Sequence, residues 1–326
     1  MFNNFSKSIF IRILFPVFAA LLIGVVCILT GSYIIEKESL NKLKYLSENQ
    51  AHGLENYIET LEKTADDLSY IISNTADIKK TKGDSFYNVD SVEQLESVIK
   101  KYSNRYNDII GISFYLFPEY SFDKKQNTYF YAKSSLKGVL EKQKVEKNEE
   151  IYLKNICINF QNDYKGLWNE PFVDKFSGLY AISYEKPIIL NNKIIGISKV
   201  NISLNEIVKF LADIKTYNEG HAFLLDKKYH VITCSTHKTT NIIENNNKLL
   251  LNLVPDAIEK ENNEIISYKN QNIKMIASFN HLEDGFIYVV NAPKNEVFEQ
   301  KYHLQRMIIG IIFMGLFAVI LILLNI

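Results

Sequence analysis

Residues 167–203 read LWNEPFVDKFSGLYAISYEKPIILNNKIIGISKVNIS, and this stretch decides how the rest of the chain is interpreted. A turn rich in Pro, Asp and Gly precedes an alternating run that predicts a β-strand. The dipeptide Asn191-Asn192 predicts a two-residue hairpin turn, because asparagine tolerates the positive φ angles that such turns need. The return strand ends at Ser203, which together with Glu206 predicts a capping box. The stretch therefore predicts a hairpin that leads directly into a capped helix.

The composition argues against several classes of function. The chain has 37 basic and 37 acidic residues, so its formal net charge is zero. Nucleic-acid binding is not expected, because it relies on clustered basic residues that displace counterions. Cys27, Cys157 and Cys234 are far apart in the sequence, which argues against a disulfide framework or a C-x-x-C site. The sequence has no G-x-S-x-G, phosphate-binding glycine loop or H-E-x-x-H motif, so no enzyme is predicted.

Two apolar segments lie near the ends of the chain. Residues 13–35 carry no charged side chain, and residues 306–326 are apolar from Met307 onward except for Asn325. Both are about as long as a membrane-spanning helix must be. A cleaved signal peptide is the alternative for the first segment, but the apolar run is longer than a signal-peptide core and no A-x-A-like site follows. We therefore expect two transmembrane helices, with residues 1–12 as a short cytoplasmic tail.

The sequence between these segments predicts a stalk helix and two similar modules. Residues 36–79 are helical in pattern, and they are followed by helix, strands and hairpin over residues 80–203 and again over residues 204–305. Apolar residues in the stalk step alternately by four and three, which is a heptad seam. This seam packs on a sheet of its own chain, or it also pairs with a second copy of the chain and carries a signal. The seam consists of Leu54, Ile58, Leu61, Ala65, Leu68 and Ile72.

Several motifs occur in a fixed order that resembles the double Cache (dCache) sensor family. The first block carries Trp168, Pro171, Phe172, Asp174, Gly178, Pro187, Gly196, Asn201 and Ser203, and the second block is residues 218–238. The members of this family are extracytoplasmic ligand-binding regions of bacterial chemoreceptors, sensor kinases and cyclic-di-GMP enzymes. The resemblance implies an α+β fold, in which two PAS-like Cache modules with antiparallel sheets lie on a long N-terminal helix between two transmembrane helices. Residues 80–203 would be the membrane-distal module and residues 204–305 the membrane-proximal one.

The function that the resemblance implies is that of a membrane-anchored small-molecule sensor. The chain would be the input region of a chemoreceptor or sensor-kinase type of signal transducer, with residues 36–305 outside the cytoplasmic membrane. A homodimer is expected if the stalk seam pairs with a second copy. No output domain follows Ile326 in this sequence, so either the chain is a truncated receptor or its cytoplasmic signalling partner is separate. A structural or partner-binding ectodomain and an anchored extracytoplasmic enzyme are the alternatives.

The resemblance also implies where a ligand binds. In the family, the distal module holds a small molecule between its sheet and the loops that cross over it, and an Asp after the Trp-Pro pair often binds the amine of the ligand. Asp174 matches that position, and a carboxylate forms short, strong hydrogen bonds with an ammonium group. Aromatic walls would add cation–π attraction, and the candidates are Trp168, Tyr131, Tyr129 and Tyr115. The alternatives are a turn cap for Asp174 and ordinary core packing for the aromatic residues.

One departure from the family concerns the carboxylate of the ligand. Amino-acid-binding members carry an Arg two residues before a Trp-Tyr pair, whereas the comparable stretch here, residues 128–131, reads TYFY without an Arg. An amine without a carboxylate, or a different small metabolite, is therefore as plausible as an amino acid.

A metal site is less favoured than a structural role at His230, Cys234 and His237, although their spacing suggests metal ligands. On a strand, His230 and Cys234 would share a face while His237 would point the other way. No cofactor is expected.

The predicted topology can be tested by cysteine labelling. A cysteine introduced at Gln143, in the distal module, should react with a membrane-impermeant maleimide in intact cells, because residues 36–305 are expected outside the membrane. The unmodified chain is the control for its native cysteines. Labelling of Gln143→Cys only after cell lysis would contradict this topology.

Overall fold

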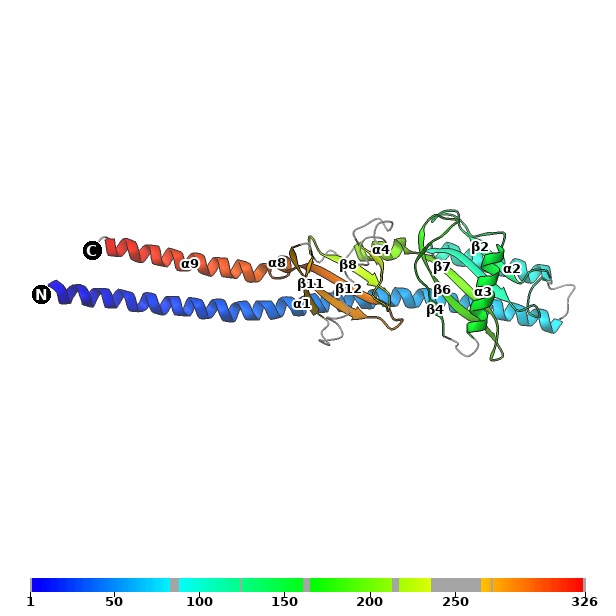
Figure 1. The fold of residues 1–326 in the computed structure, drawn as a ribbon, viewed down its shortest axis with the longest axis horizontal. Coiled ribbons are helices and arrows are strands. Elements are labelled where there is room, and N and C mark those ends of the chain that lie inside the picture. Colours follow the sequence, from blue (N-terminus) through cyan, green and yellow to red (C-terminus); the bar gives the residue numbers. More distant parts are fainter. Residues whose placement is uncertain are drawn as a thin grey trace.

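A single helix, α1 (Phe2–Lys82), runs along the whole elongated molecule, and both modules lie against it (Figure 1). The computed structural model describes residues 2–82, 88–123, 125–160, 165–212, 217–235, 265–270 and 272–324. The predicted transmembrane segment and the predicted stalk are thus parts of one continuous helix. This continuity is consistent with the sequence, because residues 17–82 contain no proline and only three glycines.

The distal module contains a seven-stranded antiparallel sheet. The strand order is β3-β2-β1-β7-β6-β4, and β5 pairs with β6. Helix α2 packs against α1 and β1, whereas α3 contacts β1 and β7. The elements are α2 (Asn88–Arg105), β1 (Ile109–Leu116), β2 (Thr128–Ala132), β3 (Glu141–Lys142), α3 (Lys147–Asn159), β4 (Leu167–Trp168), β5 (Phe172–Val173), β6 (Tyr180–Leu190) and β7 (Lys193–Ser203).

The proximal module contains a five-stranded antiparallel sheet in the order β10-β11-β12-β8-β9. Its last strand leads through a short helix into α9, which returns along α1. The elements are α4 (Leu204–Ala212), β8 (His221–Leu225), β9 (Val231–Cys234), β10 (Ile265–Asn270), β11 (Ile273–His281), β12 (Ile287–Pro293), α8 (Lys294–Val297) and α9 (Glu299–Leu324).

The hairpin that the sequence predicts is formed by β6 and β7. Asn191 and Asn192 have φ angles of 49° and 60°, as this turn requires. The predicted capping box is only half present. Ser203 Oγ accepts a hydrogen bond from the backbone N–H of Asn205 (3.2 Å), but Glu206 forms an ion pair with Lys209 instead of reaching back. The box does not close because the N–H of Ser203 donates to the carbonyl oxygen of Asp108 (2.8 Å).

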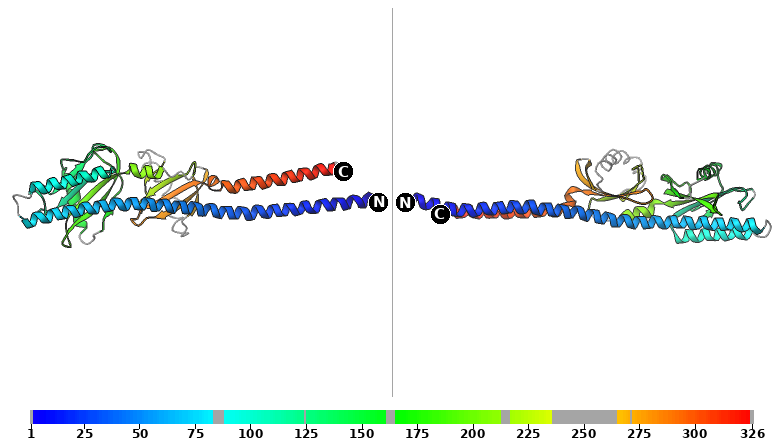
Figure 2. Two further views of the ribbon diagram at one scale, coloured as in Figure 1. Left: turned by 180° about the vertical axis from the view of Figure 1, so that it is seen from behind. Right: turned by 90° about the horizontal axis from the view of Figure 1, so that it is seen from below.

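The heptad seam of α1 is buried within the chain. Each of its residues is at most 2% exposed, and the seam belongs to the main hydrophobic core together with residues of both sheets. Figure 2 shows both modules on the same side of α1. Of the two interpretations of the seam, packing on the sheets of its own chain is therefore confirmed. The six side chains are not available as a surface for a second copy.

The two ends of the chain lie at the same end of the molecule (Figure 1), because α9 runs antiparallel to α1. Among the described residues, the helices over Val17–Asp77 and Glu299–Leu321 each contain a segment long and apolar enough to cross a membrane. Between the proximal module and the two apolar segments, Lys301 of α9 forms an ion pair with Glu36 of α1. Gln305 donates a hydrogen bond to Ser32 Oγ (2.9 Å). The two apolar segments are therefore held side by side.

We predict that Leu61→Ala destabilises the protein, because Leu61 is 1% exposed beneath the sheets. The free energy of unfolding should fall by about 2–5 kcal/mol, as is usual when a core leucine is truncated. Urea unfolding of the detergent-solubilised chain measures this change. Tyr70→Ala is the matched control, since Tyr70 lies on the same helix but is 67% exposed. Dissociation of a dimer by Leu61→Ala, without any loss of stability, would contradict this role.

Candidate functional site

The distal sheet has two buried faces with different coverings. Side chains alternate between the faces along each strand. One face, which we call the helix face, packs on α1 and α2, as shown by Ser198 Oγ lying 2.5 Å from Ser69 Oγ of α1. The opposite face, which we call the loop face, is covered by α3 and by the segment around β5. Tyr115 and Ile197 lie on this second face, where they pack against Leu153 of α3.

Three of the five predicted ligand-binding residues lie on the helix face. Tyr129 stacks on Phe114 with 4.7 Å between ring centroids. Tyr131 donates a hydrogen bond from its hydroxyl to Glu96 Oε1 of α2 (3.2 Å). Trp168 donates one from Nε1 to Glu62 Oε1 of α1 (2.6 Å). These aromatic side chains thus pack between sheet and helices. They are on the far side of the sheet from the loops, where the resemblance implies the ligand.

Asp174 and Tyr115 lie on the loop face. The turn that contains Asp174 reaches over this face, because Phe176 packs against Phe130 with 5.1 Å between ring centroids. Asp174 is 1% exposed, and its Oδ2 accepts hydrogen bonds from the N–H groups of Phe176 and Ser177 and from the Ser177 hydroxyl. Asp174 therefore caps its own turn, the alternative role considered from sequence. Among the described residues, none donates a hydrogen bond to Oδ1 of Asp174.

The structure therefore does not bring the five predicted residues together. The expectation that Trp168, Tyr129 and Tyr131 form an aromatic wall around Asp174 is corrected by the pairing of the strands. Tyr129 and Tyr131 are paired with Phe114 and Ile112, whose side chains belong to the helix-side core. Residues two apart on a strand share a face, so both tyrosines point away from the loop face.

The loop face carries a partly buried charge cluster that the sequence analysis did not identify. Lys199 is opposite Glu185 across β6 and β7, and its Nζ lies 3.5 Å from Glu149 Oε1. The same Nζ lies 4.5 Å from the ring centroid of Tyr152 and 5.6 Å from that of Phe172. Tyr152 donates a hydrogen bond to Glu185 Oε1 (2.7 Å). Burial raises the pKa of Glu185, against the lowering effects of this hydrogen bond and of the Lys199 ammonium group.

Four buried polar atoms on the loop face have no hydrogen-bond partner among the described residues. They are Ser113 Oγ, Thr128 Oγ1, Asn201 Oδ1 and Glu185 Oε2. The register places them on one face, because Ser113 pairs with Lys199, Asn201 with Gly111, and Thr128 with Tyr115. Buried polar groups are nearly always hydrogen-bonded, and leaving one unpaired costs about 1–3 kcal/mol. These atoms are consistent with a face that is completed by a bound polar molecule.

A sequence signal for these residues does exist. Ser113 interrupts the apolar strand IIGISFYL, and Lys199 interrupts IIGISKVNIS. Both strands are buried on both faces, so a polar residue within them needs a partner. From sequence alone, however, each strand could also have had one face in solvent. A polar residue is ordinary on such a face, so Ser113 and Lys199 did not by themselves indicate a binding site.

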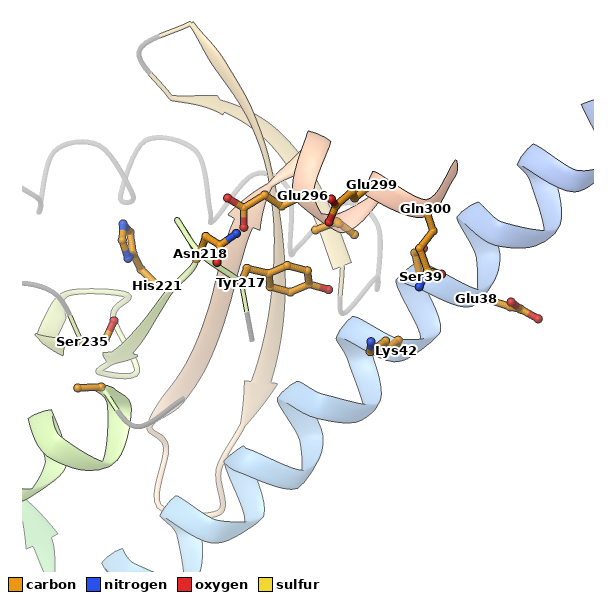
Figure 3. Close-up of a pocket in the computed structure, with 13 residues that line it drawn as sticks. Glu38, Ser39, Lys42, Tyr217, Asn218, His221, Ser235, Glu296, Glu299 and Gln300 are labelled. Carbon is orange, nitrogen blue, oxygen red and sulfur yellow. The ribbon is translucent and has the colours of Figure 1, made fainter. Parts of the chain in front are cut away.

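Two cavities lie in the described part of the chain, and the second includes Tyr152 and Glu185 of the loop face in its lining. One, of about 780 Å³, is at the end of the proximal module next to the two apolar helices, where Lys42 of α1 faces Tyr217, Glu296 and the start of α9 (Figure 3). The carboxylate of Glu296 accepts a hydrogen bond from the N–H of Glu219 there (3.2 Å). The other cavity, of about 730 Å³, is at the junction of the two modules. Neither Ser113 nor Asn201 lines either of these two cavities.

The considered metal ligands are not assembled in the described structure. His230 Nδ1 lies 3.0 Å from Asp226 Oδ2, and Cys234 is buried in β9. His237 lies outside the described residues. Within the described ranges, no group of three or more His, Cys, Asp or Glu residues could hold a metal ion.

Comparison with known proteins places this fold. Residues 95–209 match the family described as the first PDC sensor domain of methyl-accepting chemotaxis protein-like receptors. No curated protein is significantly similar in sequence.

Several solved structures share the fold at low sequence identity. The sensory domain of the Campylobacter jejuni chemoreceptor Tlp3, solved with isoleucine bound, is 16% identical, with a TM-score of 0.58 over 82% of this chain and 97% of that chain. The extracellular domain of a protein described as a histidine kinase, mmHK1S-Z2, is 18% identical, with a TM-score of 0.59 over 79% and 98%. Methyl-accepting chemotaxis protein X is 14% identical, with a TM-score of 0.59 over 80% and 99%.

The matched residues run from α2 to α4 and include the whole sheet of the distal module. The structural likeness covers 82% of this chain for Tlp3 and 79% for mmHK1S-Z2, far more than the matched residues alone. The distal module is therefore similar to the first PDC sensor domain of chemotaxis-receptor-like proteins over residues 95–209, and the chain has the double Cache fold seen in the sensor domains of chemoreceptors and histidine kinases.

Proposed function

We propose that this chain is a membrane-anchored sensor that binds a small molecule bearing a protonated amine on the loop face of its distal module. The observation that carries the proposal is the set of unpartnered polar atoms on that face, at Ser113, Thr128 and Asn201. A sensor domain whose sheet buries such atoms beneath loops is suited to a polar ligand of limited size. The two apolar helices support a two-pass arrangement with the modules outside the cytoplasmic membrane.

Asp174 is the proposed acceptor for the amine. Its Oδ2 is used by the turn, which fixes the carboxylate in place, and its Oδ1 is left for the ligand. Such a prearranged, buried carboxylate binds an ammonium group more strongly than a mobile one, because little side-chain freedom is lost on binding. Tyr115 is retained as a neighbouring wall of the same face, whereas Trp168, Tyr129 and Tyr131 support the sheet from its other side.

Lys199 bears on the choice between a plain amine and an amino acid. It places a cation on the loop face, although the stretch at residues 128–131 has no arginine. The structures of the Campylobacter jejuni chemoreceptor Tlp3 with isoleucine and with L-valine show that a protein of this fold binds amino acids. Aliphatic amino acids are therefore the first probes, with the corresponding amines that lack the carboxylate as the second set.

The proposed sensor acts without catalysis and passes its signal to a separate cytoplasmic partner, as a homodimer. The seam of α1 cannot supply the interface of that dimer, because its side chains are buried in the chain itself. The exposed side of the same helix, which presents Tyr45 and Tyr70, is the alternative surface.

The amine site is tested by calorimetric titration of the detergent-solubilised chain with the amino acid or amine that raises its melting temperature most. A ligand that binds only the native state raises that temperature by mass action. Asp174→Ala should weaken binding by about two to three orders of magnitude, since removing one partner of a buried charged pair costs about 3–5 kcal/mol. Lys199→Met should weaken binding of an amino acid much more than binding of the matching amine.

Asp174→Asn separates the two roles of this residue. The amide oxygen can still accept the hydrogen bonds of the turn, but the negative charge is lost. Glu59→Gln, at an exposed position of α1, is the control. If Asp174→Asn binds the probe as tightly as the unmodified chain, Asp174 only caps its turn and the amine site is wrong.

A further inference from the structure

The cavity at the module junction is lined by residues from three separate parts of the fold. Glu62 comes from α1, Trp168 from β4 of the distal module, and Asp284 and Phe286 from the turn between β11 and β12 of the proximal module. The cavity has a volume of about 730 Å³. Its lining does not include Asp174 or Lys199, but it reaches Tyr152 and Glu185 at the edge of the loop face.

Trp168 links the three parts by direct contacts. Its Nε1 donates a hydrogen bond to Glu62 Oε1 at 2.6 Å. Its ring packs edge-on against Phe286 of the proximal module, with 5.5 Å between centroids, and lies 4.9 Å from the ring of Tyr184 in its own module. The same proximal turn is tied to α1 a second time, because the N–H of Glu283 donates to Glu55 Oε1 (3.1 Å). The docking of the two modules thus depends on the hydrogen bonds and charges around Glu62.

Glu62 is half-buried and shares its surroundings with two further carboxylates. Burial raises the pKa of Glu62 to about 7, the Trp168 N–H opposes this rise, and the nearby carboxylates of Asp284 and Asp66 add to it. A carboxyl group beside other carboxylates retains its proton because two like charges at close range repel each other. The proton can then be shared between neighbouring carboxyl groups.

We infer that the module junction is a second sensory input, at which the proton occupancy of Glu62 sets how tightly the proximal module docks on the distal one. When Glu62 is protonated, its hydroxyl can donate to Asp284 while its other oxygen accepts from Trp168, so α1 and both modules are joined. When the proton is lost, the carboxylates of Glu62 and Asp284 repel each other. The turn that carries Phe286 is then pushed away from Trp168.

Other charged groups surround this site, and each packed element contributes some of them. Lys186 of β6 forms an ion pair with Asp66 (3.0 Å), and Lys228 forms one with Glu170 (3.5 Å) across the junction. These two lysines are thus engaged by other carboxylates than Glu62. The remaining titratable groups that line the cavity or contact its lining are Tyr152 on α3, Lys165 before β4, Tyr184 and Glu185 on β6, Asp226, Lys227 and His230 between β8 and β9, and Glu283 beside Asp284.

The sign of the pH dependence follows from the direction of the pKa shift. The folded chain holds the Glu62 proton more tightly than the unfolded chain does, since the pKa is raised on folding. The stabilising contribution of this proton is therefore fully present below the ordinary pKa of a glutamate. It is lost as the pH rises through about 7.

Trp168 supplies a direct readout, because it is the only tryptophan in the chain. We expect the fluorescence of Trp168, measured on the full chain in detergent between about pH 5 and pH 9, to change with a single transition near pH 7. Glu62→Gln keeps a hydrogen-bond acceptor for the indole but cannot titrate, so it should abolish the transition. Asp284→Asn should move the midpoint to lower pH, because it removes a repelling carboxylate.

Two control variants separate Glu62 from its surroundings. His230 contacts Asp226 at the same junction but does not contact Glu62, so His230→Gln should leave the transition in place. Glu59→Gln, at an exposed glutamate one turn earlier on α1, should also leave it in place. A transition that persists in Glu62→Gln, or one that disappears in His230→Gln, overturns the inference.

Thermal unfolding gives an independent test that does not use fluorescence of the native state. Glu62→Gln should melt at the same temperature as the unmodified chain near pH 5, and at a higher temperature near pH 9, since the variant has no carboxylate to repel Asp284. A variant that melts at a lower temperature at both pH values would show that Glu62 is only a structural acceptor for Trp168, and the inference would be wrong.

Discussion

Burial of one apolar stripe of α1 beneath two separate sheets is the constraint on which the rest of this structure depends. Leu54, Ile58 and Leu61 are at most 2% exposed, and each buried side chain of this size stabilises the fold by about 1.5–3 kcal/mol. Each sheet uses the helix as the cover of one face, so neither module has a complete core without it. The same helix continues into the apolar segment at the N-terminus, and the modules are thereby attached to the end of the molecule where both apolar helices lie.

Polar contacts along this stripe fix the register of the sheets on the helix. Ser69 meets Ser198 of the distal sheet, while Ser47 accepts a hydrogen bond from Asn280 and Gln50 one from Tyr288 of the proximal sheet. Apolar contacts alone allow some sliding, whereas buried hydrogen bonds are lost when a partner moves. Any change in how a module sits on α1 therefore has to exchange discrete contacts. Glu62 lies between these two groups of contacts, at the point where the modules meet.

The two faces of the distal sheet divide structural work from binding. Tyr129, Tyr131 and Trp168 pack on the helix face. The hydroxyl of Tyr129 accepts a hydrogen bond from the N–H of Asp123 between β1 and β2, whereas Tyr131 and Trp168 donate to glutamates of α2 and α1. The loop face has the reverse character, because it buries charge and leaves several polar atoms unpartnered among the described residues. Because the polar atoms of these three aromatic residues on the helix face are hydrogen-bonded, the sheet is held rigidly and the loop face keeps a fixed geometry. The loss of freedom on ligand binding is then small.

The sequence alone determined the order and type of most elements, since these depend on local patterns. The hairpin turn follows from Asn191-Asn192, the long helix from its unbroken periodicity, and the family from motifs in a fixed order, now supported by the match over residues 95–209. The tertiary structure decided which face of a strand meets which neighbour. Trp168 and Tyr131 could be assigned to a binding wall only while their face was unknown, because a strand buried on both sides has no polarity pattern that identifies its faces. The roles of Lys199 and Glu62 could not be predicted either, because their partners are distant in the sequence. Lys199 meets its partners across the distal sheet, and Glu62 meets its partners across the module junction.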